Sequence, residues 1–230
     1  MKNKTSLKVL FALSVMLFIL LIIRVLVTER TGYLFLLWNL FLAWVPLLLS
    51  LVIIDIYSKK YRFKNFLLII VGLFWLFFYP NAPYLITDFI HLDKYTFMTL
   101  KEQGNYFSTY VFHTDLLMWF DFTLLSIAIG IGILLGFISL FILHKIVKKH
   151  FNSMIGWLFV TIVTFLTSIA IYIGRFIRFN SWDIFSDPFE VLRVFIENIN
   201  YEFLIFVGLF FILLKGSYIA LYSLLSLSKK

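Results

Sequence analysis

The chain has 230 residues, of which 62% are hydrophobic, 20% are aromatic and only 14% are charged. A soluble domain of this size needs more charge on its surface, so the composition excludes an ordinary soluble enzyme or binding module. Cysteine is absent, which excludes disulfides, thiol catalysis and iron–sulfur clusters. The net charge of +8 lies in short basic stretches beside long apolar runs, a distribution typical of membrane proteins. We therefore predict an integral membrane protein whose surroundings are the lipid bilayer, with no nucleic-acid partner.

Six apolar runs are long enough to cross a membrane, since a spanning helix needs about 20 mostly apolar residues. The first run follows Lys2, Lys4 and Lys8, as in a signal peptide, but it is too long for one and lacks a good cleavage site. We interpret it as an uncleaved helix. With no repeat or linker visible, we expect one all-α domain over residues 1–230, a polytopic transmembrane helix bundle. The predicted spans are residues 8–27, 33–54, 66–86, 122–143, 154–174 and 203–227.

Basic residues are concentrated on one side of this predicted bundle. Six spans place the amino terminus, the 59–64 loop, the 144–150 loop and the carboxy terminus on the same side, and these segments hold most of the Lys and Arg residues. By the positive-inside rule, both termini are expected in the cytoplasm. Nearly all acidic residues fall on the opposite, outer side, so we expect polar chemistry there.

The third run meets Pro80 and Pro83 before it is long enough to cross the bilayer. Each proline lacks an N–H, which leaves the carbonyls of Leu76 and Tyr79 without helical partners. Lipid cannot satisfy these carbonyls, so we expect the break where protein or a polar cavity surrounds it. We predict a broken third helix that stops near Tyr79, with Asn81 in a non-helical turn. A proline kink satisfied by neighbouring helices is the alternative.

Two outer segments are longer than turns and too aromatic for disorder. The 87–121 segment contains an aromatic stretch, residues 106–120, that is too short to span the membrane and is expected to lie in its interface. The 175–202 segment ends in a polar stretch that is expected to form a surface helix. We expect the functional residues in these two interfacial outer segments.

The first outer segment has carboxylates and histidines that could form a site. Asp88 and His91 are three residues apart, so a helix would place both on one face. Asp121 stands at the outer end of the fourth span, where a carboxylate is functional by default. We predict Asp88, His91 and Asp121 as acid–base groups or metal ligands, with His113 as a further candidate ligand. Their spacing matches no established metal motif, so metal and cofactor remain open, and solvated loop residues are the alternative.

Arg175 and Arg178 close the fifth span, again three residues apart. Guanidinium groups match phosphate geometry, so the pair is predicted to clamp an anion; the alternative is that both anchor the helix among lipid headgroups. We expect both to point inward, toward Asp88 and Asp121, with Asp183 close enough to orient one of them. The predicted substrate-binding residues are Asn81, Tyr84, Arg175, Arg178, Asn180 and Asp183.

Polar residues also occur within the spans. Lys215 lies near the middle of the last span, where an unpaired charge costs about 2.5–3.5 kcal/mol on insertion scales. It is therefore expected to face the bundle interior or a wet crevice. Asn39 and Pro46 in the second span could line the same cavity.

Several motifs follow one another over residues 39–183. They are Asn39 to Pro46, Phe78 to Tyr84, Thr87-Asp88, His91-Leu92, Trp119-Phe120-Asp121, Gly174 to Arg178 and Asn180 to Asp183. In this order they resemble the signature of the bacterial integral membrane proteins grouped as domain of unknown function 1361. The resemblance implies a multi-pass protein of the bacterial plasma membrane. That family has no established activity, so it implies no mechanism.

Our leading interpretation is a polar site at the outer membrane face that binds or modifies an anionic, lipid-linked cell-envelope substrate. A transporter or flippase component is one alternative, with the broken helix, Lys215 and Asp121 along its path. A non-catalytic scaffold for envelope machinery is the other. Polar residues confined to the outer plane favour the first interpretation, whereas polar residues that continue inward through Asn39 and Lys215 favour transport.

Overall fold

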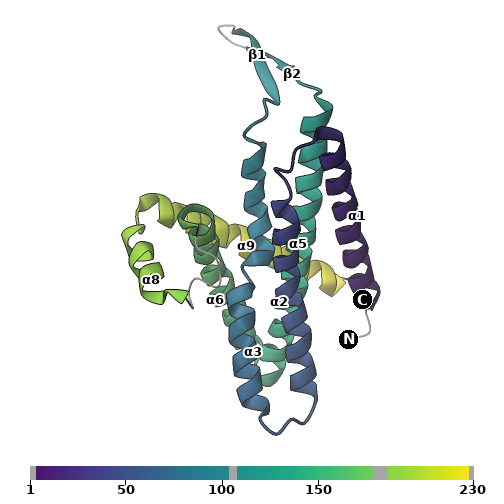
Figure 1. Ribbon diagram of the computed structural model, residues 1–230. Coiled ribbons are helices and arrows are strands. Elements are labelled where there is room, and N and C mark those ends of the chain that lie inside the picture. The colour runs from purple at the N-terminus through teal and green to yellow at the C-terminus, as the bar shows by residue number, and fades with distance from the viewer. Residues whose placement is uncertain (1–3, 104–107, 179–185, 228–230) are drawn as a thin grey trace.

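The computed structural model describes residues 4–103, 108–178 and 186–227, and this part of the chain is almost entirely helical (Figure 1). Within it, six helical segments are long and apolar enough to cross a membrane. They are Leu7–Thr28, Phe35–Ser58, Lys64–Leu92, Leu116–His150, Ser153–Ile177 and Tyr201–Leu225. The predicted all-α bundle of a multi-pass membrane protein is therefore confirmed.

The elements of the described chain follow one another from α1 to α9. They are α1 (Lys4–Thr28), α2 (Phe35–Ser58), α3 (Lys64–Phe78), α4 (Asn81–Tyr84), the 3-10 helix η1 (Leu85–Leu92), β1 (Met98–Gln103), β2 (Ser108–Phe112), α5 (Leu116–His150), α6 (Ser153–Tyr172), the π-helix η2 (Ile173–Ile177), α8 (Pro188–Glu197) and α9 (Tyr201–Leu227).

Side-chain caps mark where several helices begin. Asp115 before α5 and Asn152 before α6 each accept the backbone N–H of the third residue on, at 2.9 Å. Asp187 caps α8 in the same way at 3.1 Å, and Pro188 follows at the first helical position. Such caps satisfy donors that the first helical turn leaves free. Helix α8 forms where the sequence predicts a surface helix.

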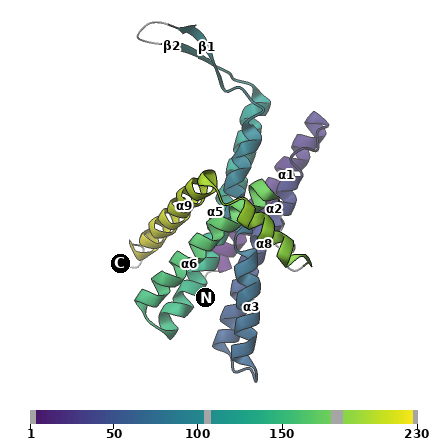
Figure 2. The same ribbon diagram turned by 90° about the vertical axis from the view of Figure 1, so that its left-hand side faces the viewer.

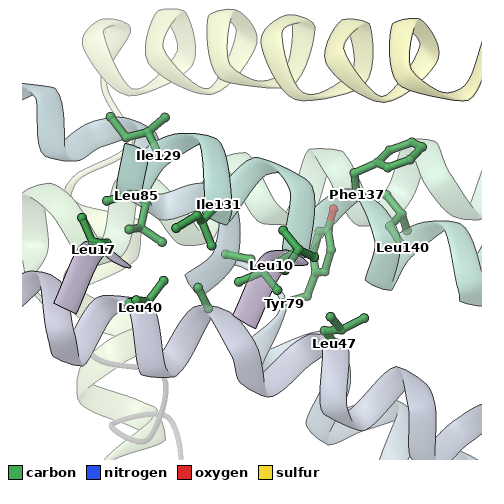
Figure 3. Close-up of a cluster of buried hydrophobic side chains, with 14 of the residues drawn as sticks. Leu10, Leu17, Leu40, Leu47, Tyr79, Leu85, Ile129, Ile131, Phe137 and Leu140 are labelled. Carbon is green, nitrogen blue, oxygen red and sulfur yellow. The ribbon is translucent and has the colours of Figure 1, made fainter. Parts of the chain in front are cut away.

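The long helix α5 is the central element, because α1, α2, α4, η1 and α6 all pack against it. Buried aliphatic side chains from several of these elements meet beside it, among them Leu17, Leu40, Leu85 and Ile131 (Figure 3). Close packing of this kind, rather than the hydrophobic effect, holds helices together in lipid.

The third span is broken where the prolines predict it, but the chain stays helical through the break. Helix α3 ends at Phe78, and α4 starts at Asn81, so the prediction of a non-helical turn at Asn81 is wrong. Two carbonyls at the break, those of Tyr79 and Phe78, accept local hydrogen bonds. Ala82 donates its N–H to the Tyr79 carbonyl at 3.2 Å, and the Asn81 side-chain amide donates to the Phe78 carbonyl at 2.9 Å.

Two glycines of α5 bring the broken helix against the centre of the bundle. A Cβ on Gly132 would lie only 2.6 Å from the carbonyl oxygen of Ala82, and one on Gly136 would lie 3.4 Å from the Ala82 Cβ. Small residues spaced by four let helices approach this closely in membranes. The glycines thus place α4, and with it η1, directly on α5.

Between η1 and α5 the described chain forms an antiparallel hairpin, β1–β2, which extends from one end of the bundle (Figures 1 and 2). From their sequence, residues 106–120 are expected to lie in the membrane interface. The structure divides the described part of this stretch between β2 and the first turn of α5. Helix α5 therefore begins at Leu116 instead of residue 122, because Asp115 caps it there. This early start brings Asp121 inside the bundle.

Candidate functional site

The helix after the break carries two rows of candidate residues. Because η1 is a 3-10 helix, residues three apart lie directly above one another. One row holds Tyr84 and Thr87, and the adjacent row holds Asp88 and His91. The predicted shared face of Asp88 and His91 is therefore present, with His91 Nε2 4.0 Å from Asp88 Oδ1.

Asp88 is the centre of this site. Only 1% of its surface is exposed, and its carboxylate is bonded from two other helices. Arg175, in η2, donates a hydrogen bond from Nη2 to Asp88 Oδ1. The side-chain amide of Asn39, in α2, donates to Asp88 Oδ2 at 3.0 Å. Burial of a carboxylate is costly unless it is paired and hydrogen-bonded, and both conditions hold here. The His91 side chain is 39% exposed, so one edge of the site is open.

Arg175 spans from η2 to both rows of η1. Its Nε donates to Thr87 Oγ1 at 2.8 Å, and its guanidinium lies 4.5 Å from the centre of the Tyr84 ring. Its side chain is only 13% exposed. This inward position differs from that of a headgroup anchor, which would extend away from the bundle. Its planar group is held in a fixed orientation by an ion pair, a hydroxyl and an aromatic face, as a preorganised anion contact requires.

Arg178 is placed differently, because the last turn of the fifth span is a π-helix. The wider turn ends with a bond from the Arg178 N–H to the Ile173 carbonyl at 2.9 Å, and Arg178 itself has a φ of 67°. The spacing of three residues therefore no longer puts the two arginines on one face. Arg175 points at Asp88 as predicted, whereas Arg178 is exposed at the edge of the site. Single π-turns occur frequently at functional sites.

Asp121 belongs to a second cluster, which the structure does not join to Asp88. Arg24 donates two hydrogen bonds to Asp121, from Nε to Oδ1 at 2.6 Å and from Nη2 to Oδ2 at 3.0 Å. Both side chains are buried. The Tyr95 hydroxyl and the Lys94 ammonium also donate to Oδ2, at 2.5 and 3.3 Å. With its oxygens occupied in this way, Asp121 ties α1 and the segment after η1 to α5.

One tyrosine connects the two clusters. The Tyr33 hydroxyl donates to the carbonyl of His91 at 3.1 Å. Its ring lies 4.3 Å from the Arg24 guanidinium and 4.2 Å from the Lys94 ammonium. The Asp121 cluster therefore supports the backbone that carries His91.

Tyr95 makes this cluster sensitive to alkaline pH. Burial and the hydrogen bond to Asp121 raise the pKa of Tyr95 to about 12, above the ordinary value of about 10. A raised pKa means that the folded state holds the proton more tightly than the unfolded chain. The resulting stabilisation is complete below pH about 10 and is lost as the pH rises through about 12.

We expect the stability advantage of wild type over Tyr95→Phe to disappear over this interval in unfolding measurements. Exposed Tyr61, which bonds to exposed Asp55, supplies the control Tyr61→Phe. A stability difference that stays constant between pH 10 and 12 would contradict the assignment.

The described residues offer no metal site of the predicted kind. No group of three or more His, Asp or Glu side chains comes together among them. His113 lies at the base of the hairpin, where its Nε2 is 3.2 Å from Thr99 Oγ1. Two further predicted residues, Asn180 and Asp183, fall outside the described part of the chain.

Lys215 lies apart from both clusters. Its ammonium donates to Thr161 Oγ1 in α6 and lies 5.4 Å from the centre of the Trp157 ring. Asn39, by contrast, has joined the Asp88 site. Asn39 and Lys215 therefore do not line one shared path through the bundle, as the transport interpretation expected.

Comparison with known protein families matches residues 38–215 to the family described as "Protein of unknown function (DUF1361)". The chain belongs to this family. No curated protein and no solved structure matches it. In this DUF1361 protein the matched region includes every described member of the Asp88 site, from Asn39 to Arg178.

Arg24 was not among the predicted site residues, and it precedes the region matched to DUF1361. A signal was nevertheless present. Charged residues inside a membrane pair with one another, and Arg24 and Asp121 lie inside or at the boundary of two spans. Thr87 was likewise not among the predicted binding residues, although it touches Arg175.

Proposed function

We propose that this protein binds an anionic head group of a lipid-linked cell-envelope molecule at the Asp88–Arg175 site, and that His91 acts on the bound group as an acid–base residue. The observation that carries the proposal is Arg175, a largely buried cation fixed against the helix after the break, with exposed Arg178 three residues further on. Two arginines against one carboxylate leave the site with a positive balance, which favours a phosphate or carboxylate ligand. In the predicted orientation, the site faces the outer side of a bacterial plasma membrane.

The separation of Lys215 from this site supports local binding over a transport path through the bundle. The open edge at His91 supports a role in proton transfer, because a general acid or base must reach the group on which it acts. Asp88 would hold Arg175 and attract a proton on His91, which makes it a positioning residue in this scheme.

The test is ligand binding by purified protein in phosphatidylcholine nanodiscs, with farnesyl phosphate as the probe. A ligand that binds only the folded state raises its thermal stability, so the midpoint shift reports affinity. We expect Arg175→Lys to bind about tenfold more weakly or worse, because a lysine cannot keep the forked contacts with Thr87, Asp88 and an anion. His91→Gln should still bind.

The matched control is Arg193→Lys. Arg193 lies on α8, is exposed and is bonded to Glu190 at 2.7 Å, so its replacement should leave the stability shift unchanged. Equal binding by wild type and Arg175→Lys would refute the proposal and favour the scaffold alternative.

A further inference from the structure

A narrow, partly open cavity of about 30 Å³ lies between the broken helix, α5 and α9. Its walls are mostly apolar. The lining residues include Tyr79, Pro83 and Ile86 on the third span, Gly136 and Phe137 on α5, and Ser217 on α9. Helix α9 packs mainly on α6, and its separation from α4 and α5 leaves this groove at the side of the bundle. Figure 3 shows Tyr79 and Phe137 below the α9 ribbon.

The groove and the charged site share the same two turns of chain. Pro83 and Ile86 line the groove, whereas their neighbours Tyr84 and Thr87 hold Arg175. Around the helix after the break, which has about three residues per turn, the row of Pro83 and Ile86 lies next to the row of Tyr84 and Thr87, so the apolar and charged surfaces adjoin. A single molecule could therefore touch both.

We infer that the groove holds the hydrocarbon chain of the same lipid whose anionic head group lies at Arg175. This inference rests on the proposed function and deepens it. It requires the substrate to be a membrane lipid, so that an anion without a hydrocarbon chain makes only part of the binding contacts. The cavity is too narrow for a helix of a partner protein, which is about 10 Å across, whereas its apolar walls and open side suit a thin hydrocarbon chain. Gly136 contributes to this width, since it adds no side chain to the wall.

The experiment compares a long-chain with a short-chain anion in the same nanodiscs: farnesyl phosphate and methyl phosphate. Lipid tails are as apolar as the groove, so the groove contributes through packing of the chain, and wild type should prefer farnesyl phosphate severalfold more strongly than a variant with a filled groove. The test variant is Ser217→Phe, which fills the groove from α9. The control is Gly216→Phe on the same helix, where a Cβ meets nothing within 4 Å. Each probe partitions into the nanodisc lipid to the same extent whichever variant is present. The difference between the two variants therefore reports binding to the protein.

We expect Ser217→Phe to lose the preference for the long chain, whereas Gly216→Phe keeps it. Both variants should still bind methyl phosphate, and adding Arg175→Lys should weaken that binding about tenfold or more. If methyl phosphate binds through Arg175 but Ser217→Phe keeps the full chain preference, the groove inference is overturned and the proposed function stands. Loss of the preference in Gly216→Phe as well would also overturn the groove. If neither probe binds through Arg175, the proposed function itself fails.

Discussion

Replacement of Asp121 by asparagine is expected to destabilise the folded protein by about 3–5 kcal/mol. The substitution keeps the shape of the side chain but leaves Arg24 as a buried charge without its carboxylate, since both side chains are almost fully inaccessible. It also weakens the acceptor of the Tyr95 hydroxyl. Equilibrium unfolding in detergent measures the effect.

Asp55→Asn is the matched control for this prediction. Asp55 pairs with Lys59 at 2.8 Å, but both side chains are exposed, and such pairs contribute little to stability. A combined Arg24→Met and Asp121→Leu variant should recover much of the lost stability, because apolar residues remove the unpaired charge. If Asp121→Asn proves as mild as Asp55→Asn, the buried pair does not hold these helices together.

The second large effect is expected from a single methyl group on α5. Gly132→Ala should destabilise the protein by about 1–3 kcal/mol, because its Cβ would meet the Ala82 carbonyl at 2.6 Å and Leu85 Cδ1 at 2.9 Å. The first of these atoms is backbone, so α4 must move. Since Tyr84 and Thr87 follow directly, we also expect weaker binding of farnesyl phosphate.

Gly130→Ala is the control, because a Cβ at that position meets no atom within 4 Å. Alanine favours a helix over glycine by about 0.5–1 kcal/mol, so this variant should be neutral or slightly more stable. Opposite signs for two Gly→Ala changes one helical half-turn apart would locate the effect at the break. If Gly132→Ala is as stable as Gly130→Ala, α4 does not rest on α5 as described.

The spans and the position of the break could be predicted because each depends on local sequence. Run length decides whether a helix crosses lipid, and Pro80 removes an N–H wherever it stands. The form of the break could not be predicted in the same way. Whether Asn81 turns or continues the helix depends on its own bond to the Phe78 carbonyl and on contact with α5.

The sequence was a better guide to which residues form the candidate site than to which of them contact one another. Asp88, His91 and Arg175 were singled out by residue type and position, and the structure brings them together. Spacing on an ideal helix suggested that Arg178 would join them, but a π-turn changed the face it occupies. The pairing of Arg24 with Asp121 joins residues 97 positions apart, and no local pattern encodes such a contact.

The most direct test of the anion site needs no added ligand. Native mass spectrometry of protein released from membranes shows which lipids remain bound. We expect wild type and Arg193→Lys to retain an anionic lipid, and Arg175→Lys to lose it. The same retained lipid on all three proteins, or none on wild type, would contradict an anion site built on Arg175.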